Sequence, residues 1–283
     1  MVLETIINPI TAERKPWEMI FIGLAYSLVA LGLSYWVFHE YISLALVFLT
    51  AMVSVPLIYN IINLEEKKDV VVSDEKTLLK EHNKVLSLIL FLFLGFTITF
   101  AVCYTILPND LAQQTFSAQT QTITTINSEV TGNFYNSLGT FSRILSNNIK
   151  VLVYCLIFAF IYGFGAIFIL TWNASVIGVA IGNFIKLGIS KGANLLGFAA
   201  VANYFHAVSL GFLRYSIHGI PEIAAYVIGG IAGSIISVAV VKHDFRTKKC
   251  ENILLDSSTL IIIAVVILFL AAILEVYVTP LLF

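Results

Sequence analysis

The chain has 283 residues, of which 59% are hydrophobic and only 12% carry a charged side chain. A soluble protein of this length cannot cover so much apolar surface, so the composition excludes a soluble globular enzyme and predicts an integral membrane protein with the lipid bilayer as its solvent. The net charge of −1 says nothing about partners, because in a membrane protein the side of the bilayer on which each charge lies matters more than the sum.

Seven stretches are apolar enough to cross a bilayer as helices. A hydrocarbon core about 30 Å thick requires roughly 20 residues of helix at about 1.5 Å per residue. The predicted crossings are residues 17–38, 41–62, 85–107, 149–172, 193–217, 220–241 and 259–279. The predicted fold class is therefore all-α, a polytopic transmembrane helix bundle of about seven crossings.

One further stretch, residues 174–190, is apolar but too short for a full crossing. It is spotted with glycine and interrupted by Asn183 and Lys186. Irregular backbone at membrane depth is stable only when it is buried in protein or lines a wet cavity. We therefore predict that this stretch is a re-entrant or interfacial helix on the cytoplasmic side.

Lysine and arginine are unevenly distributed between the predicted loops. Thirteen of the sixteen would lie on one side, which the positive-inside rule makes the cytoplasmic side. These are Arg14, Lys15, Lys67, Lys68, Lys76, Lys80, Lys84, Lys186, Lys191, Lys242, Arg246, Lys248 and Lys249, opposed by Arg143, Lys150 and Arg214. The predicted location is the cell membrane, with the N-terminus cytoplasmic and the C-terminus extracytoplasmic.

The composition divides the chain into three parts. Residues 1–107 form a predicted three-helix transmembrane unit with a cytoplasmic loop at 63–84, residues 108–146 an extracytoplasmic polar loop, and residues 147–283 a transmembrane core. Within the polar loop, apolar residues recur at helical spacing and predict an amphipathic helix. They are Ile123, Ile126, Val130, Phe134, Leu138, Phe141 and Leu145. We expect this helix to lie over the outer end of the bundle, with a docking surface for a partner as the alternative.

Three Gly-xxx-Gly pairs occur in the second half of the chain: Gly178 with Gly182, Gly188 with Gly192, and Gly229 with Gly233. This spacing exposes backbone on one helix face, so that a neighbouring helix can approach closely. The pairs predict close packing within the bundle or, alternatively, a homo-oligomer interface.

Polar residues collect at the outer ends of several predicted crossings. His218 and Glu222 are four residues apart and share a helix face, with Pro221 in the predicted first turn. Asn147, Asn148 and Arg214 are expected at the same depth, and Glu275 lies near the outer end of the last crossing. Together these residues predict a ligand-binding or partner-binding site. A set of helix caps with one Arg–Glu pair explains the same residues without a ligand.

A second polar set lies along the predicted re-entrant element and the fifth crossing. Asn173, Asn183, Lys186 and His206 form a possible polar pathway through the membrane. Helix capping explains the two asparagines equally well, and an interhelical hydrogen bond explains His206.

The sequence carries no motif of a common enzyme class. A Walker loop, a Rossmann fingerprint, a His-Glu-x-x-His pair and a serine elbow are all absent, and the three cysteines have no disulfide or metal-binding spacing. We therefore predict no enzymatic activity, no catalytic residues, no metal, no cofactor and no nucleic-acid partner.

Two stretches resemble the stage II sporulation protein M family of bacteria and archaea. Residues 141–178 contain Asn147-Asn148 and an asparagine before small residues, and residues 218–233 contain a His-Gly-x-x-Glu segment followed by glycines. The resemblance covers roughly residues 133–283. Ala174 departs from it, because many members have glycine there. The resemblance implies a multispan membrane protein whose outer face holds partners: in spore-forming bacteria the member is a membrane anchor of a complex that includes extracytoplasmic cell-wall hydrolases, while the wider family has no settled activity.

Three functions are compatible with these observations. The resemblance and the outer amphipathic helix predict a non-enzymatic membrane scaffold or anchor for envelope or membrane-remodelling partners, which would be extracytoplasmic proteins. The polar residues between helices predict instead a transporter or channel for a small solute or ion. The shared face of His218 and Glu222 gives a third hypothesis, an intramembrane enzyme.

Overall fold

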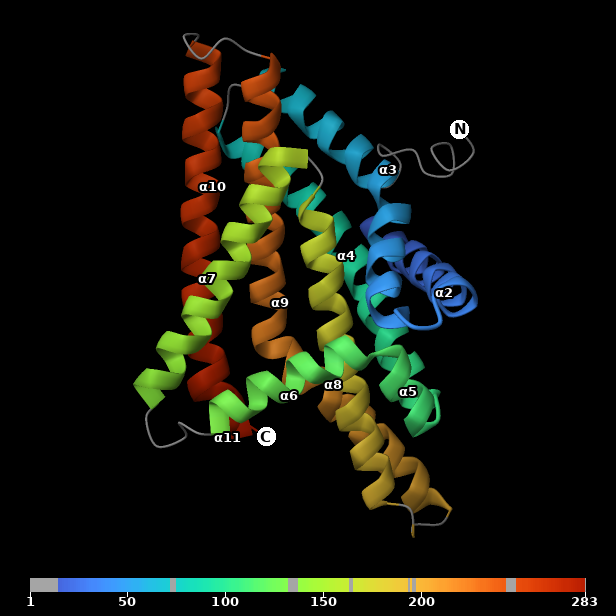
Figure 1. The fold of residues 1–283 in the computed structure, drawn as a ribbon. Coiled ribbons are helices and arrows are strands. Elements are labelled where there is room, and N and C mark those ends of the chain that lie inside the picture. The colour runs from blue at the N-terminus through green and yellow to red at the C-terminus, as the bar shows by residue number, and fades with distance from the viewer. Residues whose placement is uncertain are drawn as a thin grey trace.

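The computed structural model describes residues 15–71, 75–131, 137–162, 165–192, 194, 197–242 and 248–282, and within these residues every regular element is a helix (Figure 1). In chain order the elements are the short 3-10 helix η2 (Pro16–Glu18), α2 (Met19–Val37), α3 (Ile42–Val71), α4 (Glu75–Ile106), α5 (Asn109–Thr115), α6 (Ser117–Thr131), α7 (Ser137–Tyr162), α8 (Ala166–Lys191), α9 (Phe198–Lys242), α10 (Lys248–Ile273), the π-helix η3 (Leu274–Val278) and α11 (Thr279–Leu282). The predicted all-α class is confirmed.

Seven helical segments among the described residues are long and apolar enough to span a membrane. They are Pro16–Val37, Ile42–Asn63, His82–Ile106, Leu138–Ile161, Ala166–Lys191, Phe198–Ser237 and Ile253–Leu282. The first three and the last agree with the predicted crossings. The middle three are divided differently from the prediction.

The predicted fourth crossing, residues 149–172, is wrong because the chain reverses direction inside it. Helix α7 ends at Tyr162 and α8 begins at Ala166. A side chain at the intervening Gly165 would collide with the backbone carbonyl of Phe158, so the return depends on glycine. This reversal consists of apolar residues and glycine, and a hydropathy profile therefore shows no interruption there.

The predicted re-entrant element, residues 174–190, is also wrong: it is the main part of α8, a full-length helix of 26 residues. The predicted fifth and sixth crossings are one continuous helix, α9, of 45 residues. Pro221 lies inside α9 rather than in a first turn. Because proline cannot donate to the carbonyl four residues earlier, it allows the bend that separates the two halves of α9 (Figure 1).

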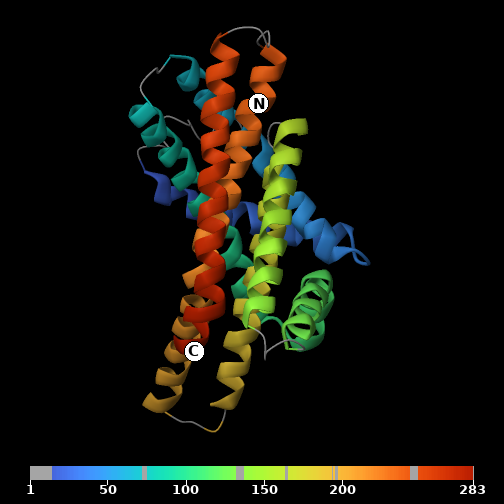
Figure 2. The ribbon, with the colours of Figure 1, turned by 90° about the vertical axis from the view of Figure 1, so that its left-hand side faces the viewer.

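Helices α8 and α9 form a hairpin that extends beyond the other helices (Figures 1 and 2). Lys186 and Lys191 lie near its turn, at the opposite end of α9 from Lys242. The prediction that placed these two lysines on the same side as Lys242 is therefore wrong.

The number of crossings among the described residues stays at seven. Helix α8 adds one crossing to the prediction, and α9 removes one by replacing two. The termini are therefore still expected on opposite sides of the membrane. Lysine and arginine are still more frequent on the predicted cytoplasmic side, but their excess over the other side is smaller than predicted. Arg14 and Arg246 lie outside the described residues.

The predicted cytoplasmic loop at 63–84 is largely helical, because α3 continues to Val71 and α4 begins at Glu75. The predicted amphipathic helix is divided in two. Helix α6 lies across one side of the bundle (Figures 1 and 2) and is tied to it by Gln119, whose Nε2 donates to Ser43 O on α3 and Ser175 Oγ on α8 at 3.3 and 3.2 Å. Leu138, Phe141 and Leu145 belong instead to α7, and Phe134 lies outside the described residues.

Each Gly-xxx-Gly pair faces a helix of the same chain. Gly178 and Gly182 lie against α4, Gly188 and Gly192 against α9, and Gly229 and Gly233 against α7. A homo-oligomer stays a prediction, but these faces are already occupied within the chain.

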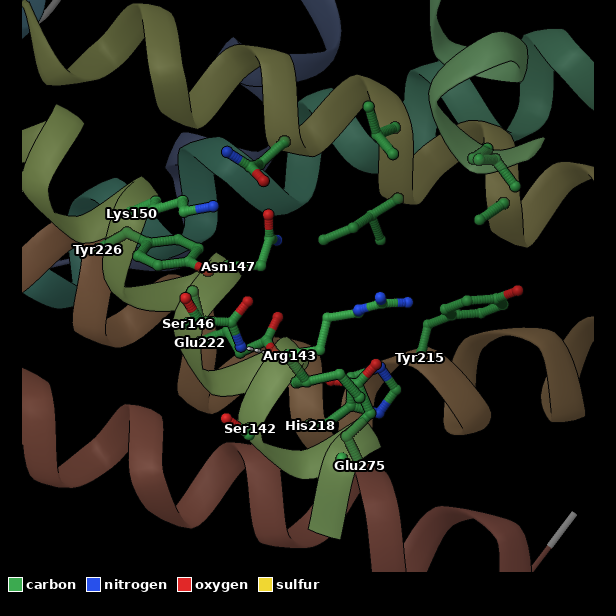
Figure 3. Close-up of a pocket in the computed structure, with 18 residues that line it drawn as sticks. Ser142, Arg143, Ser146, Asn147, Lys150, Tyr215, His218, Glu222, Tyr226 and Glu275 are labelled. Carbon is green, nitrogen blue, oxygen red and sulfur yellow. Dashed lines mark hydrogen bonds between the residues drawn. The ribbon is translucent and has the colours of Figure 1, made fainter. Parts of the chain in front are cut away.

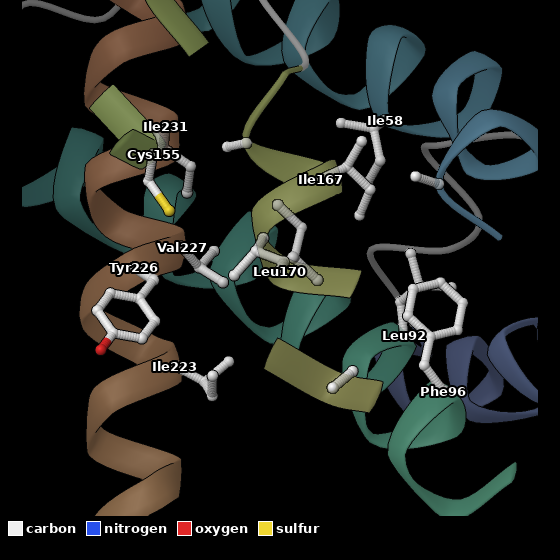
Figure 4. Close-up of a cluster of buried hydrophobic side chains, with 14 of the residues drawn as sticks. Ile58, Leu92, Phe96, Cys155, Ile167, Leu170, Ile223, Tyr226, Val227 and Ile231 are labelled. Carbon is white, nitrogen blue, oxygen red and sulfur yellow. The ribbon is translucent and has the colours of Figure 1, made fainter. Parts of the chain in front are cut away.

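Apolar side chains fill the centre of the bundle (Figure 4). Ile58 of α3, Phe96 of α4, Cys155 of α7, Leu170 of α8 and Val227 of α9 all belong to this buried cluster. The core therefore joins the first three crossings to the later ones.

Candidate functional site

A cavity of about 740 Å³ lies between α6, α7, α8, α9 and η3 (Figure 3). We call it the polar chamber. Its polar lining residues are Ser142, Arg143, Ser146, Asn147, Asn148, Lys150, Asn173, Tyr215, His218, Glu222, Tyr226 and Glu275. Its volume is typical of small-molecule sites, which span roughly 300–1,000 Å³.

One wall of the chamber is the first half of α7. Arg143, Asn147 and Lys150 are spaced by four and three residues, so a helix presents them on one face. This face exists because α7 begins at Ser137, a dozen residues earlier than the predicted crossing. The Arg143 and Lys150 side chains extend into the chamber in Figure 3 and give this wall positive charge.

The facing wall is α9, which presents His218, Glu222 and Tyr226 at intervals of four residues. The expectation that His218 and Glu222 share a face holds in the structure because α9 is continuous through both. His218 Nδ1 lies 3.4 Å from Thr279 Oγ1, which ties this part of α9 to α11. Tyr226 is buried.

Glu275 reaches the chamber from the π-helix η3. A π-helical turn is rare and is frequently found at functional sites. The carboxyl groups of Glu222 and Glu275 lie close to each other. Asn148 Nδ2 also donates to Glu222 Oε1 at 2.6 Å. Two ionised carboxylates repel each other at this separation, so the pair needs a proton or a cationic group between or beside it.

The structure brings together four of the five residues predicted for a ligand or partner site: Asn147, Asn148, His218 and Glu222 line the chamber. Arg214 does not line it. Its guanidinium instead lies 5.6 Å from the ring centroid of Phe184 on α8.

The four residues of the predicted polar pathway do not come together. Only Asn173 lines the chamber. Lys186 Nζ donates to the carbonyl of Leu107 at 2.7 Å and so caps the end of α4. Asn183 and His206 are exposed on the hairpin. A pathway through Lys186 and His206 required the re-entrant element that α8 replaces.

Sequence reasoning missed Arg143, Lys150, Tyr215 and Tyr226 as lining residues and left Glu275 at the margin of the site. The spacing of Arg143, Asn147 and Lys150 carried a usable signal, because a helix beginning before residue 143 places all three on one face. No local pattern indicates the π-helix that directs Glu275.

The family model of stage II sporulation protein M matches residues 86–280. The chain belongs to the stage II sporulation protein M family. The match begins in α4, so it covers the third crossing, which the resemblance noted from the motifs did not include. The Asn147-Asn148 motif and the His218 to Glu222 motif, 70 residues apart in the sequence, lie on facing walls of the chamber. No curated protein and no solved structure matches the chain.

Proposed function

We propose that this protein is a membrane carrier that binds a zwitterionic solute or headgroup in the polar chamber. The observation that carries the proposal is the placement of opposite charges on different walls. Arg143 and Lys150 come from α7, while Glu222 and Glu275 come from α9 and η3. A ligand with one anionic and one cationic group satisfies both walls at once.

Charge and space together favour a ligand over a purely structural role for these residues. Ionisable groups within membrane-spanning helices are costly, and those that persist are usually paired or functional. Here a cavity of about 740 Å³ lies between the wall that carries Arg143 and Lys150 and the wall that carries Glu222 and Glu275. A purely structural role does not require this volume, because side chains that only stabilise the fold pack closely.

The geometry also favours a binding site over an open channel. The chamber ends on α8 at Ala180, well before Lys186, and its lining does not reach His206 on α9. A carrier needs only a site that opens alternately to each side, whereas a channel needs a continuous path.

The proposal is tested by equilibrium binding of radiolabelled phosphoethanolamine to the full chain in phosphatidylglycerol nanodiscs. Phosphoethanolamine carries both charges, so it should bind at least tenfold more tightly than ethanolamine or inorganic phosphate. We expect Arg143→Gln and Glu275→Gln each to weaken binding by roughly tenfold, since an interaction with a charged group contributes about 1.5–3 kcal/mol. Uptake into vesicles then separates a carrier from a receptor.

Two exposed charges outside the chamber serve as controls. Lys191→Gln on α8 and Glu251→Gln on α10 remove one charge of each sign without touching the lining. Both variants should bind phosphoethanolamine like the wild type. Absence of saturable binding, or equal losses in the control variants, would contradict the proposal.

The scaffold function remains a second proposal, and the hairpin supports it. Phe198, Val201, Phe205 and Val208 follow one another at helical spacing along α9, and Phe198 and Phe205 are 87% and 73% exposed. Exposed aromatic side chains in such a stripe are typical of a surface that contacts protein or lipid. Crosslinking in membranes should capture a protein partner that Phe205→Ser loses and Phe21→Ser, on α2, retains. Recovery of no protein other than the chain itself would remove this candidate.

The prediction that the chain is not an enzyme is tested separately. His218 contacts Thr279, and Glu222 contacts Asn148 and Glu275. If a membrane-associated activity is found and the His218→Ala, Glu222→Ala double variant retains it in full, these two residues are not its catalytic groups.

A further inference from the structure

We infer that the ligand of the polar chamber is an amphiphile, whose hydrocarbon part passes between α8 and α9 into an apolar groove on the other side of these helices. This inference rests on the proposed function and names the class of ligand. Four observations carry it: the groove, the shared wall, the packing of α8 against α9, and the empty space at Gly219.

The apolar groove lies between α4, α8 and α9 and has a volume of about 360 Å³. Leu90, Phe91 and Leu94 of α4 form one side, and Ile181 of α8 and Ile223 of α9 contribute to the other. Leu94 and Ile220, at the edge of the groove, are exposed. In a membrane such an exposed apolar edge faces lipid, so the groove is accessible to a hydrocarbon chain from the bilayer.

The groove and the polar chamber are neighbours. Ile177 of α8 and Tyr215 of α9 line both cavities. On α9, residues 215, 218, 222 and 226 face the chamber, while residues 212, 216, 219 and 223 face the groove. The Ile177 and Tyr215 side chains therefore lie at the boundary between the polar chamber and the apolar groove.

Helices α8 and α9 are in close contact on both sides of the level of Ile177 and Gly219. At the hairpin end, a Cβ on Gly188 would lie 2.8 Å from the Cβ of Ala207. Near the other end, a Cβ on Gly230 would lie 2.9 Å from the Cβ of Ala166. Both distances are too short for a real side chain, so the two helices pack closely at these two levels. The chamber and the groove both lie between them.

Gly219 lies on the groove side of α9, at the level between these contacts. It is buried, yet a Cβ built on it would meet no atom within 4 Å. A buried glycine normally allows a neighbour to approach closely, as Gly188 and Gly230 do. Gly219 instead faces the open space of the groove. We call the place bounded by Ile177, Tyr215 and Gly219, where the hydrocarbon chain of the ligand would pass, the α8–α9 window.

An amphiphile matches this arrangement better than a free solute. A zwitterionic headgroup would occupy the chamber between the charges of α7 and those of α9 and η3, and its chain would leave through the window into the groove. A free solute with the same headgroup chemistry would fill only the chamber and would make no use of the neighbouring groove.

The test compares two unlabelled competitors against radiolabelled phosphoethanolamine on the full chain in a maltoside detergent. One is phosphoethanolamine itself, and the other is a lauroyl lysophosphatidylethanolamine, which adds a hydrocarbon chain to the same headgroup. On the wild type we expect the lysolipid to displace the label at concentrations at least tenfold lower. Gly219→Phe fills the window and should remove this advantage while phosphoethanolamine affinity is retained.

Gly32→Phe is the matched control, because a Cβ at Gly32 on α2 also meets no atom within 4 Å and is far from the window. It should retain the full advantage of the lysolipid. Leu94→Trp narrows the groove from α4 and should also reduce the advantage of the lysolipid. It provides the test if Gly219→Phe does not fold. Two results would overturn the inference that the ligand is an amphiphile: equal potency of the two competitors on the wild type, or an advantage of the lysolipid that is unchanged in Gly219→Phe or Leu94→Trp. Neither result would contradict the proposed function. Failure of the label to bind at all overturns both.

Discussion

The α2–α4 contact and the polar chamber are two helix interfaces of this chain that are built in opposite ways. In the first, Gly23 and Gly95 bring two backbones together, and a Cβ on Gly95 would lie 2.9 Å from the Cα of Gly23. One turn further on, the hydroxyls of Ser27 and Thr99 lie 2.8 Å apart. In the second, long charged side chains from α7, α9 and η3 surround a cavity.

This difference distinguishes residues that stabilise the fold from residues that we propose to bind a ligand. Small residues without a cavity give close helix packing, which is the main stabilising contact where lipid supplies no hydrophobic force between helices. Large polar residues around a cavity do not maximise packing. Substitutions in the α2–α4 contact should therefore change stability and not ligand affinity, and substitutions in the chamber should do the reverse.

The largest effect on stability is expected for Gly95→Leu. The new side chain would collide with the backbone carbonyl of Ile20 and with Gly23, and overpacking of this kind costs about 3 kcal/mol. Thermal unfolding in a maltoside detergent should show a large decrease in midpoint, while the exposed control Gly32→Leu should unfold like the wild type. Equal midpoints for the two variants would show that the α2–α4 contact is not closely packed.

A smaller loss is expected for Lys186→Met. The ammonium group donates to Leu107 O at 2.7 Å and to Tyr104 O at 3.4 Å, and it lies 5.5 Å from the Tyr104 ring centroid. Removing a charged donor from a helix end costs about 2 kcal/mol. Lys191→Met, on the exposed end of the same helix, is the control and should leave the unfolding midpoint unchanged. If the two variants unfold alike, Lys186 does not join α8 to α4.

Ser27→Ala tests the polar part of the α2–α4 contact. The Ser27 hydroxyl is buried, and its one proton can be donated either across the interface to Thr99 Oγ1 at 2.8 Å or within α2 to the Gly23 carbonyl at 2.6 Å. Interhelical hydrogen bonds in membranes contribute roughly 0.6–1 kcal/mol, so we expect a loss of about 1 kcal/mol. Phosphoethanolamine affinity should stay the same. A decrease in affinity would contradict the claim that the α2–α4 contact affects only stability.

The smallest effect on stability, and a clear effect on binding, is expected for Asn147→Ala. Asn147 is exposed and lines the chamber. Substitutions of exposed residues usually change stability by less than about 0.5 kcal/mol, whereas loss of one hydrogen bond of about 1 kcal/mol weakens binding roughly fivefold. A stability loss as large as that of Ser27→Ala, with unchanged affinity, would assign Asn147 to the fold rather than to the ligand.

Part of the candidate site was predictable because it depends on local spacing. His218 and Glu222 share a face on any helix that contains both, and Asn147 and Asn148 are adjacent. Arg214 was expected to join them because it lies near the outer end of the predicted fifth crossing, at the same depth. It stacks on Phe184 instead, since α8 packs against that part of α9. Which face of a helix meets which neighbour is decided by contacts between residues far apart in the sequence.

The sequence by itself determined that this is an all-α membrane protein with seven crossings, because hydropathy and helical periodicity are local properties that packing does not change. Only the tertiary structure decided where the middle crossings begin and end. The reversal before α8 contains only glycine and apolar residues, so no polar residue in the sequence indicates it. Helix α9 continues through residues 218–219 without a turn, although the sequence predicts a break there. The chamber likewise depends on the π-helix that directs Glu275 toward Glu222, a contact between segments 53 residues apart that no local pattern specifies.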